Sequence, residues 1–173
     1  MRKFMRSVLV SALALTAGVA AHAATDTTDF KVKITITESC DIKTVAATDV
    51  DFLTHARSSA TSNIDAQGNL AVTCTKDTPY AIALDMGQNS SASVASATNR
   101  RMVLTGNYVP YGLYRDASRT QLWGNVGGTG GDTLTGTGTA ALQSIPVYGR
   151  VLSNAINVPA GVYLDTVRAT ISY

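Results

Sequence analysis

Two cysteines, Cys40 and Cys74, are the residues best suited to covalent chemistry in this sequence. Their even number favours a disulfide if the chain reaches an oxidising compartment, where paired thiols are the rule. Closing a loop of this size stabilises a fold by about 3–4 kcal/mol, because it removes chain entropy from the unfolded state. A metal site is the poorer alternative, since two isolated cysteines and His55 cannot supply a closed zinc shell. We therefore expect a disulfide, no metal and no cofactor.

His55 is the residue best placed for a catalytic triad, because Asp51 and Ser58 lie near it in sequence. The sequence has no nucleophile motif such as G-x-S-x-G, however, so an exposed loop histidine is the better interpretation. The glycine run at 127–131 lacks the Lys-Ser/Thr pair of a P-loop, and no helical pattern follows it. We read this run as a flexible hairpin connection, and the sequence predicts a protein that is not an enzyme.

Residues 1–23 have the pattern of a secretory signal peptide. A basic start at 1–6 is followed by an apolar run at 8–20 and by Ala-His-Ala at 21–23. The apolar run is shorter than the roughly 20 residues that a membrane-spanning helix needs. We expect cleavage after Ala23, which would bring the two cysteines into an oxidising compartment.

Removal of the signal peptide changes the charge balance. It contains three of the 14 lysines and arginines and none of the 12 acidic residues, which leaves 11 basic and 12 acidic residues in the mature chain. No basic run or face remains that would indicate a nucleic-acid partner. The mature length is that of one ordinary domain with a single hydrophobic core.

The mature sequence is typical of an all-β protein, because apolar residues recur at every second position and no long stretch has a helical period. Stretches at 88–99 and 124–138 are polar or rich in glycine, and we expect both to be loops. Arg100 and Arg101 read as a solvated pair at a strand start, and Pro146 favours an edge strand or a bulge. Short strands with polar turns indicate an antiparallel sandwich. The predicted strands are 30–37, 42–52, 69–75, 80–86, 101–105, 108–114, 142–152 and 163–173.

The segment before Cys40 has the strictest alternation. Four large apolar residues alternate there with lysine and threonine, and we call them the apolar comb: Phe30, Val32, Ile34 and Ile36. They form one apolar edge about 20 Å long. The residues alone leave two readings open, since the comb could be the first strand of its own sandwich or a spare strand.

A second alternating segment lies at the end of the sequence, and its apolar face consists of Val167, Ala169, Ile171 and Tyr173. A final strand at the end of a chain is common, so this pattern alone indicates little. Together with the apolar comb, it favours a sheet that lacks its last strand and a strand that has no place in its own sheet.

Several motifs together resemble the spore coat protein U domain family. The C-terminal signature of that family is similar to YGR at 148–150, NVPAGVYLDTV at 157–167 and TISY at 170–173. Other similar motifs are SC at 39–40, VTCT at 72–75, TPY at 78–80, NY at 107–108, LYRD at 113–116, RT at 119–120 and WG at 123–124. The resemblance covers nearly all of the mature chain and is weakest in the loops at 54–66 and 88–99.

This family includes subunits of archaic, Csu-type chaperone–usher pili, so the resemblance implies an incomplete immunoglobulin-like antiparallel sandwich. Residues 24–39 would form an N-terminal donor strand that completes a neighbouring subunit through the apolar comb. Residues 40–173 would form the sandwich domain. The Cys40–Cys74 disulfide would join the start of the first domain strand to the end of the second.

The resemblance also implies a groove, partners and a location. The face formed by Val167, Ala169, Ile171 and Tyr173 would border the acceptor groove. The partners would be copies of the chain or related subunits, a periplasmic chaperone and an outer-membrane usher, without nucleic acid or membrane insertion. The protein would be exported through the periplasm to a cell-surface pilus that supports adhesion and biofilm formation.

Two other functions fit parts of the sequence. A secreted surface-binding module, such as an adhesin or coat protein, is disfavoured because a tip adhesin needs a receptor domain and lacks a donor strand. A small outer-membrane β-barrel fits the aromatic end of the last strand. It needs about eight strands of about ten residues with two aromatic girdles, and the aromatic residues here do not recur at strand ends.

Overall fold

The computed structural model describes residues 23–57 and 62–173, and these residues form strands and loops without a helix. Two units are distinguished, one that ends at Thr35 and one that comprises Ile36–Tyr173. The predicted signal peptide falls almost entirely on residues 1–22, which lie outside the described residues. No helix in the described part has the length and apolarity needed to cross a bilayer.

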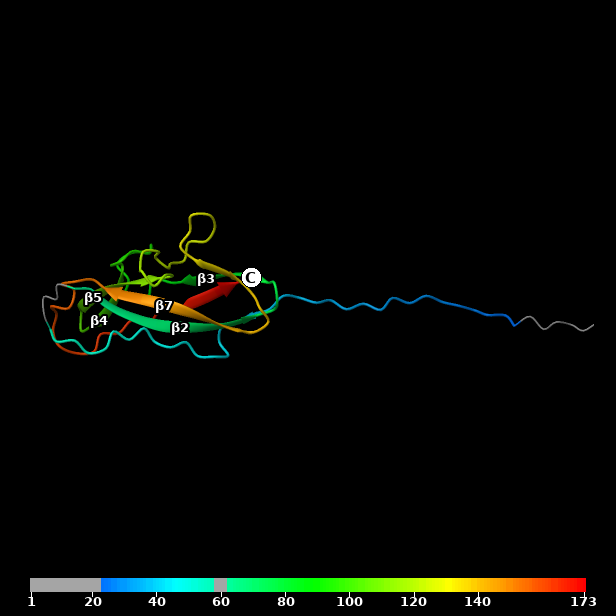
Figure 1. Ribbon diagram of the computed structural model, residues 1–173, viewed down its shortest axis with the longest axis horizontal. Coiled ribbons are helices and arrows are strands. Elements are labelled where there is room, and N and C mark those ends of the chain that lie inside the picture. The colour runs from blue at the N-terminus through cyan, green and yellow to red at the C-terminus, as the bar shows by residue number, and fades with distance from the viewer. Residues whose placement is uncertain (1–22, 58–61) are drawn as a thin grey trace, which may run out of the picture. The chain divides into compact units, whose positions relative to one another are not determined.

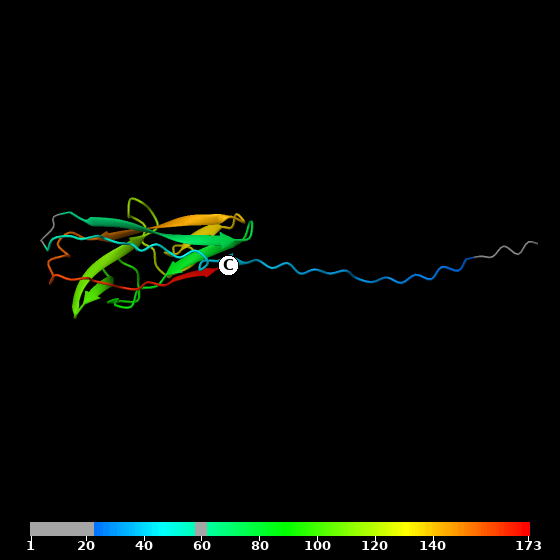
Figure 2. The same ribbon diagram turned by 90° about the horizontal axis from the view of Figure 1, so that it is seen from below.

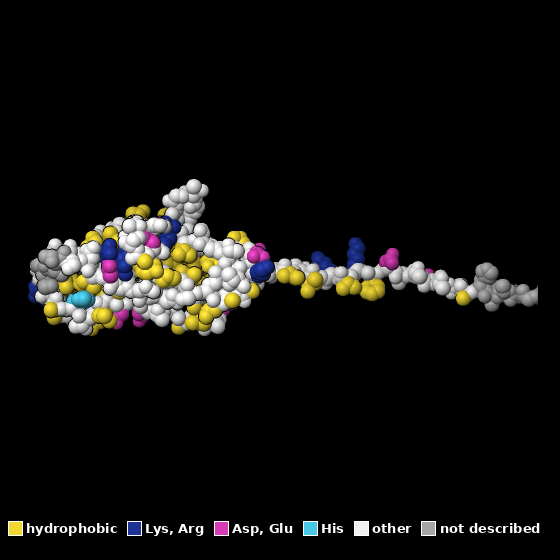
Figure 3. Space-filling model, in the orientation of Figure 1, with side chains coloured by type: hydrophobic (Ala, Val, Ile, Leu, Met, Phe, Trp, Pro, Cys, Tyr) yellow, Lys and Arg dark blue, Asp and Glu magenta, His cyan; other side chains and the backbone are white. Residues whose placement is uncertain are grey.

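The N-terminal unit is an extended segment over residues 23–35, where no strand is assigned. Its apolar side chains are exposed, at 84% for Phe30, 89% for Val32 and 81% for Ile34. Figure 3 shows hydrophobic side chains along one side of this segment and basic side chains along the other. The alternation therefore gives the segment two distinct faces, although the strand predicted at 30–37 is not assigned in the structure.

The second unit is an antiparallel two-sheet sandwich (Figure 1). Its five-stranded sheet has the order β1-β2-β7-β5-β4, and its three-stranded sheet has the order β6-β3-β8. The strands are β1 (Cys40–Asp41), β2 (Ile64–Cys74), β3 (Pro79–Leu84), β4 (Arg100–Leu104), β5 (Asn107–Tyr114), β6 (Leu134–Thr137), β7 (Leu142–Val151) and β8 (Ala169–Ser172). The prediction of an all-β antiparallel fold is confirmed.

The core lies between the two sheets and is formed by alternate residues of their strands. In β3, for example, Tyr80, Ile82 and Leu84 are buried, because successive side chains of a strand point to opposite faces. Trp123 is fully buried as well, and its indole Nε1–H donates a hydrogen bond to the carbonyl of Ile82 at 2.8 Å. The largest aromatic side chain is thus packed with its polar atom satisfied.

Strand β7 shows how proline and glycine fit into a sheet. Pro146 pairs with Asn69 of β2, whereas pairing between β7 and β5 involves only residues 148–150 of β7. Pro146 therefore lies where β7 has one pairing neighbour, which a residue without an N–H tolerates. Gly149 permits a close approach, since a Cβ there would lie 2.5 Å from Cγ1 of Val50.

The predicted loop at 124–138 is wrong at its end, where the structure places β6. Strand β6 pairs with β3 from Pro79↔Thr137 to Ile82↔Leu134. Its sequence has little apolar pattern, so the pairing with β3 determines its conformation. Gly136 lies against the Tyr80 ring, because a Cβ there would be 2.5 Å from Cζ of Tyr80.

Candidate functional site: an apolar groove open to the core

A groove of about 1050 Å³ opens into the interior of the sandwich domain. Two chain segments form its walls: the first wall is residues 47–57 and the second wall is residues 158–169. Figure 2 shows both segments, cyan and orange to red, running along the length of the domain. Each wall is at least eleven residues long, which is enough to lie beside a bound strand.

The floor of the groove consists of core side chains from both sheets, namely Leu70, Leu84, Val109, Tyr111, Leu113, Val147 and Val151. Phe52 of the first wall packs edge-to-face against Tyr111 of the floor, with ring centroids 6.3 Å apart. Apolar side chains inserted into the groove would therefore continue the hydrophobic core.

In the part of the chain that the structure describes, one isolated bridge attaches the first wall to β2. The amide of Thr48 donates to the carbonyl of Asn69 at 2.9 Å, and the amide of Asn69 donates to the carbonyl of Thr48 at 3.3 Å. This approach requires Gly68, because a Cβ there would lie 2.5 Å from the Thr48 carbonyl oxygen. Val50 and Phe52 pack against the core, so this wall is a short amphipathic edge beside the groove.

The second wall is held by hydrogen bonds at three points. The amide of Val103 in β4 donates to the carbonyl of Leu164 at 2.9 Å. Further along, the amide of Arg168 donates to the Asp85 carboxylate at 2.9 Å, and the amide of Asp85 donates to the carbonyl of Arg168 at 3.0 Å. Asp165 provides the third point.

Asp165 points inward from the second wall and accepts hydrogen bonds on both carboxylate oxygens. The Tyr111 hydroxyl donates to Oδ2 at 2.7 Å, and the amide of Gln88 donates to Oδ1 at 3.0 Å. Asn89 adds its backbone and side-chain N–H groups. Burial, and then the hydrogen bond to Asp165, raises the pKa of Tyr111 far above its ordinary value, so the phenol remains a donor.

Arg100 is a buried cation close to this wall, and the prediction that it is solvated is wrong. Its side chain is fully buried, and its Nη2 donates to the carbonyls of Leu84 at 3.1 Å and Asp85 at 2.7 Å. Desolvation lowers the pKa of Arg100 below its ordinary value. Arg101 is partly exposed and lies over the Tyr108 ring, with Cζ 4.2 Å from the centroid.

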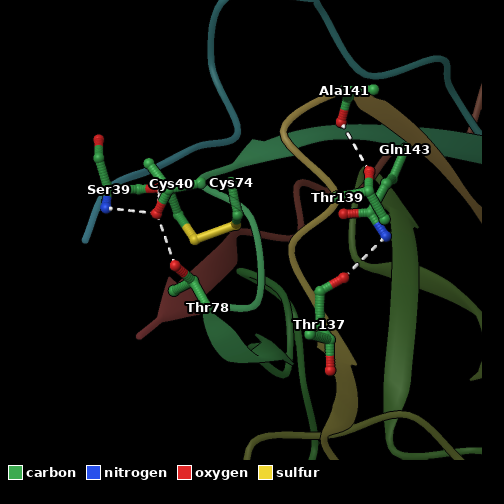
Figure 4. The surroundings of a disulfide bond; sticks show 9 residues. Ser39, Cys40, Cys74, Thr78, Thr137, Thr139, Ala141 and Gln143 are labelled. Carbon is green, nitrogen blue, oxygen red and sulfur yellow. Dashed lines mark hydrogen bonds between the residues drawn. A yellow bond between two sulfur atoms is a disulfide. The ribbon is translucent and has the colours of Figure 1, made fainter.

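Cys40 and Cys74 form the expected disulfide (Figure 4). The two residues are register partners between β1 and β2, and their Cα atoms are 4.0 Å apart. Around the bond, the amide of Thr75 donates to the Ser39 carbonyl at 2.9 Å, and the amide of Ser39 donates to Oγ1 of Thr75 at 3.2 Å. The disulfide thus attaches the start of the domain to the end of β2.

A family model for the spore coat protein U domain matches residues 26–170. The protein belongs to the spore coat protein U domain family. Protein U of Myxococcus xanthus is 39% identical over 109 residues, which are 61% of this chain and 59% of Protein U. The chain therefore spans less than two thirds of that relative.

A solved structure shares the fold of the present protein. It is the CsuC–CsuE chaperone–tip adhesion subunit pre-assembly complex from archaic chaperone–usher Csu pili of Acinetobacter baumannii. The match has a TM-score of 0.55 and 21% sequence identity, and it covers 80% of this chain and 40% of the matched chain. The immunoglobulin-like fold class expected from the sequence is thereby confirmed.

Of the four residues expected to border the acceptor groove in this spore coat protein U domain, two line the groove and two do not. Val167 and Ala169 line the groove. Ile171 pairs with Ile82 and packs against the core, and Tyr173 is 58% exposed. Neither of these two residues is among those that line the groove. The assignment of all four to the border of an acceptor groove stays a prediction.

Sequence reasoning missed two features of the site. Asp165 interrupts the apolar face formed by its neighbours Tyr163 and Val167, and an acid at such an inward position could have indicated a buried hydrogen-bond acceptor. Sequence reasoning also predicted a strand at 42–52, which covers only part of the first wall, and the structure has only the isolated bridge of Thr48 in that range. His55, weighed there as a catalytic residue, is exposed, and its Nε2 lies 2.7 Å from the Phe52 carbonyl. Among the described residues, no group of three or more His, Cys, Asp or Glu could hold a metal ion.

Proposed function

We propose that this protein is a structural, non-catalytic subunit of a chaperone–usher surface pilus and that it polymerises by donor-strand exchange. In this reaction the apolar comb of one copy fills the groove of the next. One observation carries the proposal: the groove opens directly onto buried core residues, while the same chain has a strictly alternating apolar segment with exposed side chains. Completion of pilins by a donated strand is a general mode of strand addition.

The energetics favour an intermolecular strand. Burial of the four side chains of the apolar comb would contribute roughly 6–12 kcal/mol, at about 1.5–3 kcal/mol for each large apolar residue. A whole domain is stable by only about 5–15 kcal/mol. A subunit with an empty groove is therefore marginally stable and has an unpaired sheet edge, whereas a filled subunit is well within the stable range.

The proposal assigns residues 1–23 to a signal peptide, 24–39 to the donor strand and 40–173 to the sandwich domain. The family model begins at residue 26, after the proposed signal peptide, and it includes the apolar comb. The second wall, with Val167 and Ala169, would contact the inserted strand.

The partners in this proposal follow from the open groove. A periplasmic chaperone would fill it before assembly, and an outer-membrane usher would exchange the chaperone for the donor strand of the next subunit. The assembled pilus would lie on the cell surface and support adhesion and biofilm formation. The likeness in fold to a chain of a chaperone–tip subunit pre-assembly complex supports the chaperone step.

Deletion of residues 24–38 tests the proposal. The shortened subunit keeps both cysteines and every groove-lining residue, so it should fold with its chaperone but should not link to other copies. Electron microscopy and denaturing gels without boiling would detect fibres and multimers. A matched control replaces the comb residues with serine and keeps the segment length. Fibres from the shortened chain would contradict the assignment of residues 24–39 as the donor strand.

A further inference from the structure

The outward faces of the donor segment and of the first wall carry opposite charges. Lys31 and Lys33 are the only charged residues in the segment 30–37, and they alternate with the apolar comb. Asp49 and Asp51 have the same spacing on the first wall, where both are exposed and both line the groove. Two cations and two anions are therefore presented with equal periodicity.

The direction of the aspartates follows from the packing of the first wall. Val50 and Phe52 turn toward the core, so the alternating Asp49 and Asp51 point to the outer side. Among residues 23–57 and 62–173, only the amide of Leu53 donates a hydrogen bond to Asp51, at 2.8 Å. Within the described residues, neither carboxylate takes part in an ion pair.

The second wall has no acid on its outer side to compete for the lysines. Its exposed residues are Pro159, Ala160, Gly161, Val162, Leu164, Thr166 and Arg168. Arg168 is the one charged residue in this set, and it repels a lysine. Asp165 faces inward, where Tyr111 donates to it. The lysines of a donor strand are therefore attracted by the aspartates of the first wall and repelled by Arg168 of the second wall.

We propose that Asp49 and Asp51 recognise Lys31 and Lys33 of an incoming donor strand and thereby select its register. This inference rests on the proposed donor-strand exchange, and the occupant is the segment 30–36 of a second copy. With the comb in the groove, the lysines of the donor stand on the same outer face as the two aspartates. Opposite charges on neighbouring strands attract, and like charges repel.

The charges supply information that the apolar comb lacks. A slip of one residue turns the comb away from the core and is excluded by hydrophobicity. A slip of two residues keeps the apolar alternation, because the side-chain period of a strand is two. It leaves one lysine without its aspartate, so the paired charges distinguish the correct register from this neighbour.

Charge reversal tests the recognition in the chain from residue 24 onward. One variant carries Lys31→Glu and Lys33→Glu, and a second carries Asp49→Lys and Asp51→Lys. Each variant alone places like charges together, so we expect the concentration for half-maximal multimer formation to rise about tenfold. An equimolar mixture of the two variants should restore assembly, because each donor then meets a groove of opposite charge.

The mixture makes a specific prediction about the product. Neither variant fits its own groove, so subunits should alternate strictly along the multimer, which mass spectrometry of dimers with one isotope-labelled variant can measure. The control Lys43→Glu with Lys76→Glu has the same change in net charge as Lys31→Glu with Lys33→Glu, at exposed residues that do not line the groove. It should assemble like the wild type. Circular dichroism checks that each variant folds.

The outcomes separate this inference from the function on which it rests. If the wild type forms no multimers, donor-strand exchange itself is contradicted. If the wild type assembles and the two reversal variants assemble equally well alone, the charge recognition is wrong and the exchange stands. Random mixing of folded variants in the multimer would also overturn the recognition. If a reversal variant does not fold, the double variant Asp49→Asn with Asp51→Asn is tested in its place. An unchanged concentration for half-maximal multimer formation in that variant would also show that the charge recognition is wrong.

Discussion

The apolar comb and strand β8 have the same alternating pattern and opposite environments. In β8, Ala169 and Ile171 pair with Leu84 and Ile82 of β3 and pack against the core. In the comb, Ile34 is 81% exposed. Period-two alternation therefore sets which face of a segment is apolar, but it does not set which sheet buries that face. The difference is the basis of the proposed assembly, because a spare apolar face needs a partner.

The largest effect on stability should come from giving the apolar comb a place in the sheet of its own chain, as β8 has. Residues 24–39 attached after Tyr173 through a flexible linker could insert next to β8 within one chain. We expect the free energy of unfolding to rise by at most about 6–12 kcal/mol. The gain is smaller if the unfolded chain already buries part of the apolar surface of the comb. Guanidinium unfolding of the monomer would measure this gain.

The control for this chimera has the same linker and segment with the four comb residues replaced by serine. It should show no gain in the free energy of unfolding. An equal gain in both proteins would mean that the added length, and not the apolar comb, stabilises the domain.

Smaller effects should come from truncating one isoleucine in each region. The change in β8 should lower the stability of the monomer, and the change in the comb should weaken assembly. Ile171→Ala removes a half-buried side chain next to Ile82, so we expect a loss of about 2 kcal/mol in the free energy of unfolding. Ile34→Ala should leave the stability of the dilute monomer unchanged and weaken assembly at least about tenfold. Urea unfolding and a multimer gel distinguish the two responses, and equal losses of monomer stability would contradict the comparison.

Effects of similar or smaller size concern the part of the C-terminal segment that lies before β8. There the wall is held by Asp165, so Asp165→Ala should cost about 2 kcal/mol of unfolding free energy and Tyr111→Phe about 1 kcal/mol. Hydrogen exchange should become faster at 158–168 and stay unchanged in β2. The exposed Asp49→Ala is the control, with an expected change within about 0.5 kcal/mol. Unchanged exchange at the wall in Asp165→Ala would show that the contacts of Leu164 and Arg168 hold it without Asp165.

Particular residues show how far the sequence can predict this fold and its site. The patterns around Val72, Ile82 and Leu113 predicted buried strands, because each alternates large apolar side chains with small or polar ones. Strand β6 has hardly any such pattern, and its conformation comes from pairing with β3. Arg100 looked like a surface cation, because nothing in its local sequence shows that the carbonyls of Leu84 and Asp85 will surround it.

The sequence by itself determined the all-β class, the family, the cysteine pair and the two-faced character of the apolar comb, because composition and local alternation are properties of the chain alone. Only the tertiary structure decided that residues 47–57 and 158–169 become two walls of one groove, with Asp165 bonded to Tyr111 and two aspartates on the outer rim. The physical reason is separation along the chain. Contacts between segments about a hundred residues apart depend on how the sheets pack, which no local pattern records.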